Sequence, residues 1–269
     1  INRSELLEML GTLISSTNLG IVDSTSGLLQ SLVSADSSMA HDTCSMLVSL
    51  SRQNQDDSML LLRYSDVLAR IAALSSETLS ICEQTGGIQV IITQVRSNDV
   101  LVQLNALELL EILANTEYGV SMLFRTGEVS HLLDLSQGTE TSPADPILGV
   151  TALRTLHCAL GKFSHELFRL SSGYDEILQR FLHAVAGFIS SGDESSKLAG
   201  MQAIASLAGA SAAGLHAVLS DAMLLDTWLS VLNHKAQLQA ACLRSLARVI
   251  NPSIAVTQGH VVVADVSAV

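Results

Sequence analysis

Two glycines in the C-terminal third have the spacing of a phosphate-binding loop. Gly209 and Gly214 are separated by four residues, as in loops whose backbone amides surround phosphate oxygens. In such loops the second glycine is followed by lysine and by serine or threonine, which contact phosphate and magnesium. This chain has Leu215 and His216 at those places. The segment therefore predicts a turn between helices, and we expect no nucleotide or other cofactor.

Histidine, cysteine and serine are also too scattered to form a catalytic or metal site. His157 and Cys158 are adjacent, so in a helix their side chains point to different sides, and no second pair follows nearby. No G-x-S-x-G turn presents a nucleophilic serine. We therefore assign no catalytic residue and no metal ligand, and we expect no enzyme. Free buried thiols in a reducing compartment are predicted for Cys44, Cys82, Cys158 and Cys242.

The charge and hydropathy of the chain exclude two further classes of partner. The formal net charge is −12, from 26 acidic and 14 basic residues, and no lysine- or arginine-rich block occurs. Nucleic-acid binding depends largely on basic side chains that neutralise phosphates, so a nucleic-acid partner is not expected. The mean hydropathy is +0.40, but apolar runs are far shorter than the roughly 20 residues of a membrane span. Protein partners, and basic ones in particular, remain.

A short apolar block recurs along the chain and predicts the fold class. Counting from Leu107 to Leu153, Ile204 and Leu243 gives steps of roughly 46, 51 and 39 residues, the range of helical armadillo and HEAT repeats. Hydrophobic residues make up 48% of the chain but aromatic residues only 3%, which suits closely packed helices. We predict an all-α, armadillo/HEAT-like α-solenoid, a right-handed superhelix. Because the chain starts without methionine in a helical pattern, we expect a fragment of a longer array.

The repeats divide the chain into an array and a tail. Residues 1–250 accommodate about six partial or complete units. A register break falls near 53–58, where the apolar pattern returns after only half a repeat. The segment 137–146 contains glycine and prolines and predicts a long loop. Residues 251–269 are rich in valine without helical spacing, which indicates an atypical tail or a truncated continuation.

One unit is regular enough to serve as a template. Thr85–Gly87 predicts a turn, followed by a helix up to Val95. The polar run 97–99 offers an N-cap for a helix over 100–114, and 117–125 predicts a shorter helix that Gly127 terminates. Further helices are expected at 150–160, 174–189, 195–208 and 224–232, and the last repeat is expected to end near residue 250. Trp228 lies in an apolar stretch and is expected in the core.

A polar stripe on these helices is the candidate binding surface. When the apolar blocks are aligned, polar residues recur at i, i+3 and i+6 on the opposite side of each helix. In a solenoid such residues line up on neighbouring helices and form the concave surface, although an ordinary solvated face is the alternative. The candidate residues are Asn105, Glu108, Glu111, Thr151, Arg154, His157, Gln202 and Arg244.

Several stretches resemble one known family. They are LLLRYSDVL at 60–68, SICEQTG at 80–86 and NDVLVQLNALE at 98–108, then EYG at 117–119 and GEV at 127–129, and more weakly 174–182 and 192–207. In this order they are similar to the family of the non-ATPase regulatory subunit 5 of the 26S proteasome. The chain departs from that family near 53–58, and it lacks the family's N-terminal and C-terminal regions.

The resemblance implies a function. Members of the family are assembly chaperones for the base of the proteasome regulatory particle. They hold the C-terminal domain of an AAA ATPase subunit before the ring is complete and are absent from the mature particle. For this chain the resemblance implies the same partner, base assembly intermediates, and a cytoplasmic location with the nucleus as a second compartment.

A different binding function is the rival hypothesis. Armadillo adaptors such as importins and catenins hold extended peptides with a ladder of asparagines on the third helix of each repeat. The corresponding positions here are Glu111, His157, Ala208 and Ala247, without a regular asparagine. Binding of an extended peptide is therefore the less favoured interpretation.

Overall fold

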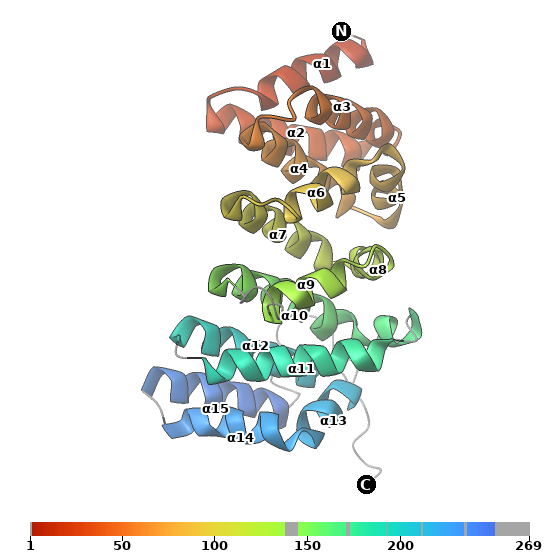
Figure 1. The fold of residues 1–269 in the computed structure, drawn as a ribbon. Helices are drawn as coiled ribbons and strands as arrows, with labels where there is room; N and C mark the ends of the chain where they lie inside the picture. Colours follow the sequence, from red (N-terminus) through yellow and green to blue (C-terminus); the bar gives the residue numbers. More distant parts are fainter. Residues whose placement is uncertain are drawn as a thin grey trace. The chain divides into compact units, whose positions relative to one another are not determined.

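A computed structural model describes residues 2–137, 145–170, 173–191, 193–210, 212–233 and 236–250, and these residues are helical without any strand (Figure 1). The all-α prediction is thereby confirmed. Most of the expected loop at 137–146, and the whole tail 251–269, lie outside the described residues. Within the described residues, no single helix is long and apolar enough to cross a membrane. One pair of helices, bent by 81° at the break between them, meets the length and hydropathy criterion only when the two are counted together.

The chain forms two compact units, Ile1–Met122 and Leu123–Val269. The helices of unit 1 are α1 (Arg3–Ile14), α2 (Leu19–Ala35), α3 (Met39–Gln53), α4 (Ser58–Ala72), α5 (Ser76–Thr85), α6 (Gly87–Val95) and α7 (Val100–Ala114). The boundary falls within α8 (Glu117–Arg125). The helices of unit 2 are α9 (Glu128–Gln137), α10 (Pro146–Leu170), α11 (Tyr174–Ser190), α12 (Glu194–Ala210), α13 (Ala212–Ser220), α14 (Ala222–Ser230), the 3₁₀ helix η1 (Val231–Asn233) and α15 (Ala236–Ile250).

Local sequence signals set the limits of α5, α6 and α7. Ser75 forms a capping box with Thr78 at the start of α5, and Gly86 ends α5 in the left-handed conformation with φ of 88°. The carboxylate of Asp99 accepts hydrogen bonds from the amides of Leu101 and Val102, at 2.9 and 3.3 Å, and so caps α7. The predicted turn at 85–87 and the predicted helices at 100–114 and 117–125 are confirmed.

Helices α4 and α7 pack against each other and run parallel in unit 1. The side-chain amide of Gln94, in the last turn of α6, donates to the hydroxyl of Ser65 in the middle of α4. At their C-terminal ends, the phenol of Tyr118, just after α7, donates to the carbonyl oxygen of Ala73, at 2.5 Å. The helix before α7 is thus bonded to the middle of α4 and the helix after α7 to the end of α4, which fits a parallel course of α4 and α7.

The turn between α1 and α2 is held against α4. Arg63 donates from Nη1 to the carbonyl oxygen of Ser16 at 2.7 Å, and the hydroxyls of Ser15 and Tyr64 lie 2.9 Å apart. Because α2 starts at Leu19, this places the N-terminal end of α2 beside the first turns of α4. The α2 and α4 helices also pack against each other.

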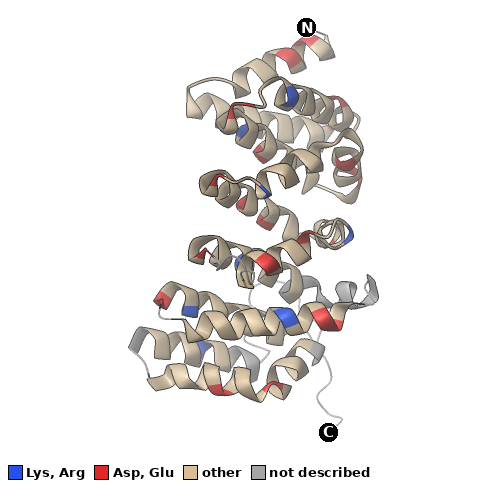
Figure 2. Cartoon of the chain, in the orientation of Figure 1, with Lys and Arg blue, Asp and Glu red and all other residues tan. Residues whose placement is uncertain are grey.

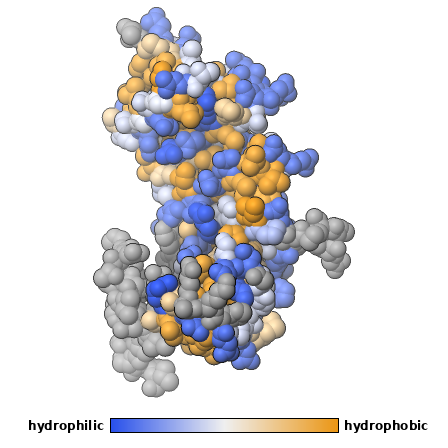
Figure 3. All heavy atoms as spheres, turned by 90° about the vertical axis from the view of Figure 1, so that its left-hand side faces the viewer, coloured by the Kyte–Doolittle hydropathy of each residue, from blue (hydrophilic) through white to orange (hydrophobic). Residues whose placement is uncertain are grey.

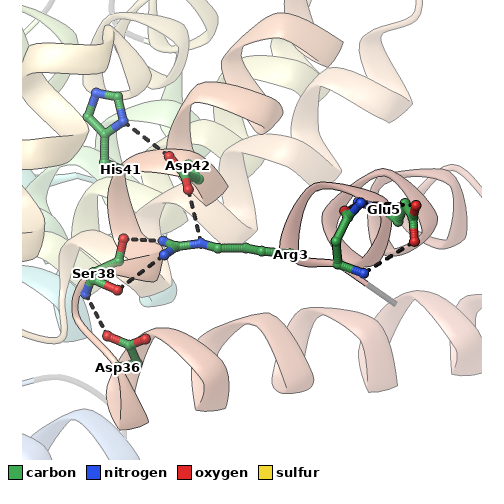
Figure 4. Close-up of polar contacts among 7 residues, drawn as sticks. Arg3, Glu5, Asp36, Ser38, His41 and Asp42 are labelled. Carbon is green, nitrogen blue, oxygen red and sulfur yellow. Dashed lines mark hydrogen bonds and ion pairs between the residues drawn. The ribbon is translucent and has the colours of Figure 1, made fainter.

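A surface network joins the start of α1 to the start of α3 (Figure 4). The guanidinium of Arg3 contacts a carboxylate oxygen of Asp42 at 3.0 Å and donates to both the hydroxyl and the carbonyl oxygen of Ser38. The carboxylate of Asp36 accepts from the Ser38 amide at 3.0 Å, and this local hydrogen bonding with Ser38 lowers the pKa of Asp36. His41 also lies 3.5 Å from Asp42. These contacts join the N-terminal end of α1 to α3, although such exposed pairs contribute little to stability.

Unit 2 is held together around α12, which packs on α10, α11 and α15. Arg180 on α11 forms a 2.7 Å ion pair with Asp134 on α9, and its carbonyl oxygen accepts from Gln137 at 2.8 Å. Trp228 is fully buried, and Cys242 donates to its carbonyl oxygen at 3.5 Å. The predictions of a core Trp228 and of free buried cysteines are confirmed. Ser211, in the turn expected between Gly209 and Gly214, lies outside the described residues.

Candidate partner-binding surface

In unit 1, the polar stripe predicted on α7 is at the surface. Asn105 and Glu108 are exposed, and Glu111 is half-buried. The amide nitrogen of Asn105 donates to the carbonyl oxygen of Leu101, one turn earlier, at 2.6 Å. The opposite side of the helix carries Leu107 and Leu110, which are fully buried. The α7 helix thus presents a carboxylate and an amide on a face that the core leaves uncovered.

In unit 2, the remaining candidates lie on three helices that pack in succession, α10, α12 and α15. Arg154, Gln202 and Arg244 are exposed, and His157 is half-buried. Thr151 differs from the others, because it is buried and its hydroxyl donates to the carbonyl oxygen of Ile147 at 3.0 Å. Thr151 therefore offers little surface to a partner in this conformation.

The structure adds residues of α4 that the sequence alignment of the stripe did not include. Asp57 caps α4 as Asp99 caps α7, and the two caps are 42 residues apart. With this alignment Arg63, Asp66 and Arg70 occupy the turns of α4 that correspond to Asn105, Glu108 and Ile112 on α7. Arg70 donates from Nε to both carboxylate oxygens of Asp66 at 2.9 Å. The α4–α7 pair therefore carries both signs of charge on one polar face.

A sequence signal for these residues existed. An aspartate that caps a helix, followed two places later by an apolar residue, occurs at Asp57, Asp99, Asp145 and Asp221. Aligning these caps, instead of the apolar blocks, places α4 in the same position of its repeat as α7. The apolar stretch Ser45–Leu50 does not belong to this series, because it lies in α3.

Other arrangements among the described residues do not form a chemical site. No group of three or more metal-binding side chains is present in this part of the chain. A cavity of about 530 Å³ lies between α11, α13 and α14, and is lined by residues that include His216, Ser220 and Asp221. The Ser220 hydroxyl and His216 Nδ1 are 3.5 Å apart and both side chains are exposed. Such a loose contact does not hold a nucleophile against a base.

Among the described residues, charged positions are distributed over many helices and not gathered in one block, as Figure 2 shows. One match to known proteins is to a family model. The model of the family described as proteasome non-ATPase 26S subunit matches residues 1–254. This chain belongs to that family. A mouse protein, the 26S proteasome non-ATPase regulatory subunit 5, is 23% identical over 145 residues. That match covers 53% of this chain and 29% of the mouse protein, so the chain spans less than a third of this relative.

Solved structures similar to this member of the proteasome non-ATPase 26S subunit family are helical-repeat proteins. An engineered protein has a TM-score of 0.58 at 19% identity, and covers 93% of this chain and 99% of its own. A designed armadillo repeat protein, solved with a peptide of alternating lysine and arginine, has a TM-score of 0.59 at 15% identity, over 90% of this chain and 99% of its own. Computationally designed armadillo repeat proteins match with a TM-score of 0.58 at 16% identity, over 89% of this chain and 98% of the designed chain. The armadillo-type fold is thereby confirmed.

The family and the fold together define the general role. The chain is a proteasome-related solenoid protein with the architecture of a binding scaffold. In such folds side chains on the repeat helices contact the partner, and the core residues keep the helices in register. The exposed faces of α4 and α7, and those of α10, α12 and α15, are the candidates for that contact.

Proposed function

We propose that this protein is an assembly chaperone for the base of the 26S proteasome regulatory particle, and that it binds the C-terminal domain of one AAA ATPase subunit. The family membership supports the connection with the proteasome. The observation that carries the binding role is the exposed polar face on α4 and α7, with Arg70 and Glu108 on neighbouring parallel helices. A rigid face with many modest contacts can hold a domain and release it when the closing ring covers the same surface.

The client would be selected by charge as well as by shape. On the α4–α7 face Asp66 is already paired with Arg70, whereas Glu108 lies on the exposed side of the adjacent helix. Steering between opposite charges affects the association rate and the choice of partner more than the final affinity. The client domain should therefore present a basic side chain opposite Glu108 of α7. In cells the complex should be found in the cytoplasm and nucleus, which imaging of a tagged chain would test.

Calorimetry with the isolated C-terminal domain of each proteasomal ATPase tests this function. We expect binding to one domain and at least a tenfold loss of affinity in Glu108→Lys. Glu8→Lys is the matched control, because Glu8 is an exposed residue of α1 and the charge change is the same. Absence of binding to every domain, by a chain whose circular dichroism spectrum shows that it is helical and folded, would refute the proposal. Equal losses in both variants would show that net charge matters and the α7 face does not.

An adaptor for extended peptides is not favoured. The designed armadillo protein solved with a peptide shares the fold with this chain, but at 15% identity it shows nothing of the ligand. Glu111 and His157 stand at two positions where a peptide-binding ladder would have asparagine. The chaperone role accounts for the family membership, and the adaptor role does not.

A further inference from the structure

The most exposed large apolar side chains of the described residues share one location. Each of the five follows an asparagine or aspartate cap and stands at the first or second position of a helix. They are Leu101, Leu19, Ile147, Met59 and Met223, with 60 to 70% of their surface exposed. The first turn of a helix needs an oxygen cap and tolerates polar residues well, so helix formation does not explain this choice.

Three of these side chains belong to neighbouring helices of unit 1. Leu19, Met59 and Leu101 begin α2, α4 and α7, and we call them the apolar row. Arg63 on α4 connects the first two, because its guanidinium contacts both the carbonyl oxygen of Ser16 and the sulfur of Met59, at 2.7 and 3.5 Å. The starts of α2 and α4 are therefore close together.

The other connection in the apolar row is between α4 and α7. The side chain of Gln94 donates to the carbonyl oxygen of Leu61 at 3.4 Å, as well as to Ser65. Gln103, on the second turn of α7, donates to the carbonyl oxygen of Val95 at 2.8 Å and closes the turn between α6 and α7. The first turns of α4 and α7 thus both lie beside the last turn of α6, and α4 also packs against α7. Met59 and Leu101 occupy the same position on each helix.

Single exposed apolar residues are normal on protein surfaces and need no explanation. Three at the starts of helices in contact are different, because one partner can cover them together. Figure 3 shows hydrophobic surface interrupting the hydrophilic residues on one face of the molecule. The distances between the three residues of the apolar row determine which kind of partner can cover them.

The charges beside the apolar row favour a basic partner. Asp56, Asp57 and Asp99 are exposed and flank Met59 and Leu101 in sequence. The cap hydrogen bonds of Asp57 and Asp99 use one carboxylate oxygen of each residue, which leaves the second oxygen outside the cap. The guanidinium of Arg63, one turn after Met59 on α4, is already bonded to backbone carbonyl oxygens. A net charge of −12 acts in the same direction.

The spacing of the helices favours a helical partner. Packed helices lie about 8–10 Å apart, so the three members of the apolar row should follow each other at about that interval. In a partner α-helix, residues seven positions apart lie on one face at a separation of about 10.5 Å. An amphipathic helix with an apolar residue at every seventh position matches this interval, and basic residues beside its apolar face would meet the aspartates.

We propose that the apolar row Leu19, Met59 and Leu101 docks an amphipathic α-helix of a partner protein, with basic residues flanking its apolar face. The helix would cross the N-terminal ends of α2, α4 and α7, where it buries the three apolar side chains and approaches Asp57 and Asp99. This site is independent of the proposed chaperone function, because the chemistry of the row selects the helix whichever protein supplies it.

A synthetic peptide tests this proposal with the full chain. The probe is a fluorescein-labelled helical 18-residue peptide with leucine at every seventh position and lysine beside the leucines. In fluorescence anisotropy we expect saturable one-to-one binding. Leu101→Ser and Met59→Gln should each weaken binding at least tenfold. Replacing the lysines of the peptide by glutamate should weaken it to a similar extent, and added salt should weaken binding of the lysine peptide.

A matched control distinguishes the row from apolar exposure in general. Met223 also follows an aspartate cap and is similarly exposed, but it belongs to α14 in unit 2, so Met223→Gln should not change binding. Equal loss in Met223→Gln, or absence of saturable binding, would overturn the proposal. Sedimentation that shows self-association abolished by Leu101→Ser would also overturn it, because a second copy would then cover the row. No ATPase domain takes part, so these outcomes leave the chaperone proposal untouched.

Discussion

Tyr118 donates a hydrogen bond of 2.5 Å to the carbonyl oxygen of Ala73, and this bond joins the first turn of α8 to the end of α4. Tyr118→Phe removes the donor and leaves the carbonyl without this partner. We expect a loss of about 1 kcal/mol in the free energy of unfolding. Urea denaturation followed by circular dichroism measures it, and an unchanged midpoint would show that water replaces the phenol.

The cap of α7 should contribute a similar amount. Asp99→Ala removes the carboxylate that accepts from the amides of Leu101 and Val102, and should cost about 1 kcal/mol of stability. Asp99→Asn keeps an accepting oxygen and is the control, with a loss of a few tenths at most. Thermal unfolding of both variants gives the comparison, and equal losses would assign the effect to charge and not to the cap.

Two glycines should respond to alanine in opposite ways. A methyl group at Gly119 would lie 2.1 Å from the carbonyl oxygen of Leu113, too close for the backbone to accept without moving. Gly119→Ala should therefore cost at least about 1–3 kcal/mol. A methyl group at Gly27, inside α2, meets no atom within 4 Å, so Gly27→Ala should stabilise by about 0.5–1 kcal/mol. Chemical denaturation measures the free energy of unfolding of both variants. A change of the same sign in both would contradict this prediction.

Asp193 should make part of the stability dependent on pH. Hydrogen bonds with Ser196, of which the backbone amide bond is 2.7 Å long, lower the pKa of Asp193 below its ordinary value of 3.8. Because the folded pKa is the lower one, the stabilisation is complete above 3.8 and is lost as the pH falls through the folded value. The difference in Tm between the wild type and Asp193→Asn should therefore shrink below pH 3.8. A constant difference would contradict this linkage.

The thiol of Cys82 should resist alkylation in the folded protein. A hydrogen bond with Cys44 and burial raise the pKa of Cys82 well above its ordinary value, and only the thiolate reacts readily. With iodoacetamide at pH 8, mass spectrometry should find Cys82 unmodified in the native chain and modified in urea. Rapid labelling of Cys82 in the folded chain would contradict the packing of α3 against α5.

Local signals explain which parts of the fold could be predicted. The limits of α7 and α8 follow from Asp99 and Gly127, whose roles as cap and terminator depend only on nearby backbone. The start of α10 was predicted at Val150, but the helix begins at Pro146. Proline is tolerated at a first helical position, and Asp145 caps it through the amide of Ile147 at 2.9 Å. A proline that looks like part of a loop thus begins a helix.

The candidate surface was harder to predict than the helices. Glu108 follows from periodicity alone, because it stands opposite Leu107 and Leu110 on one helix. The corresponding face of α4 can be recognised only once α4 is known to pack beside α7. Hydrogen bonds from Gln94 and Tyr118 to α4 and its C-cap hold that arrangement. Side-chain hydrogen bonds between helices leave no periodic trace in a sequence. Partner binding by the predicted stripe therefore stays a prediction.

The hydrogen bonds described above between separate helices join residues no more than 49 positions apart, the widest being Ser15 with Tyr64. Tyr118 and Ala73 are 45 apart, and Asp134 and Arg180 are 46 apart. Contacts this local need little loop closure, so they favour rapid folding. On the ribosome, Tyr64 can reach its partner Ser15 long before residues near 200 are made. Successive groups of helices can therefore fold during synthesis, before the C-terminal residues are translated.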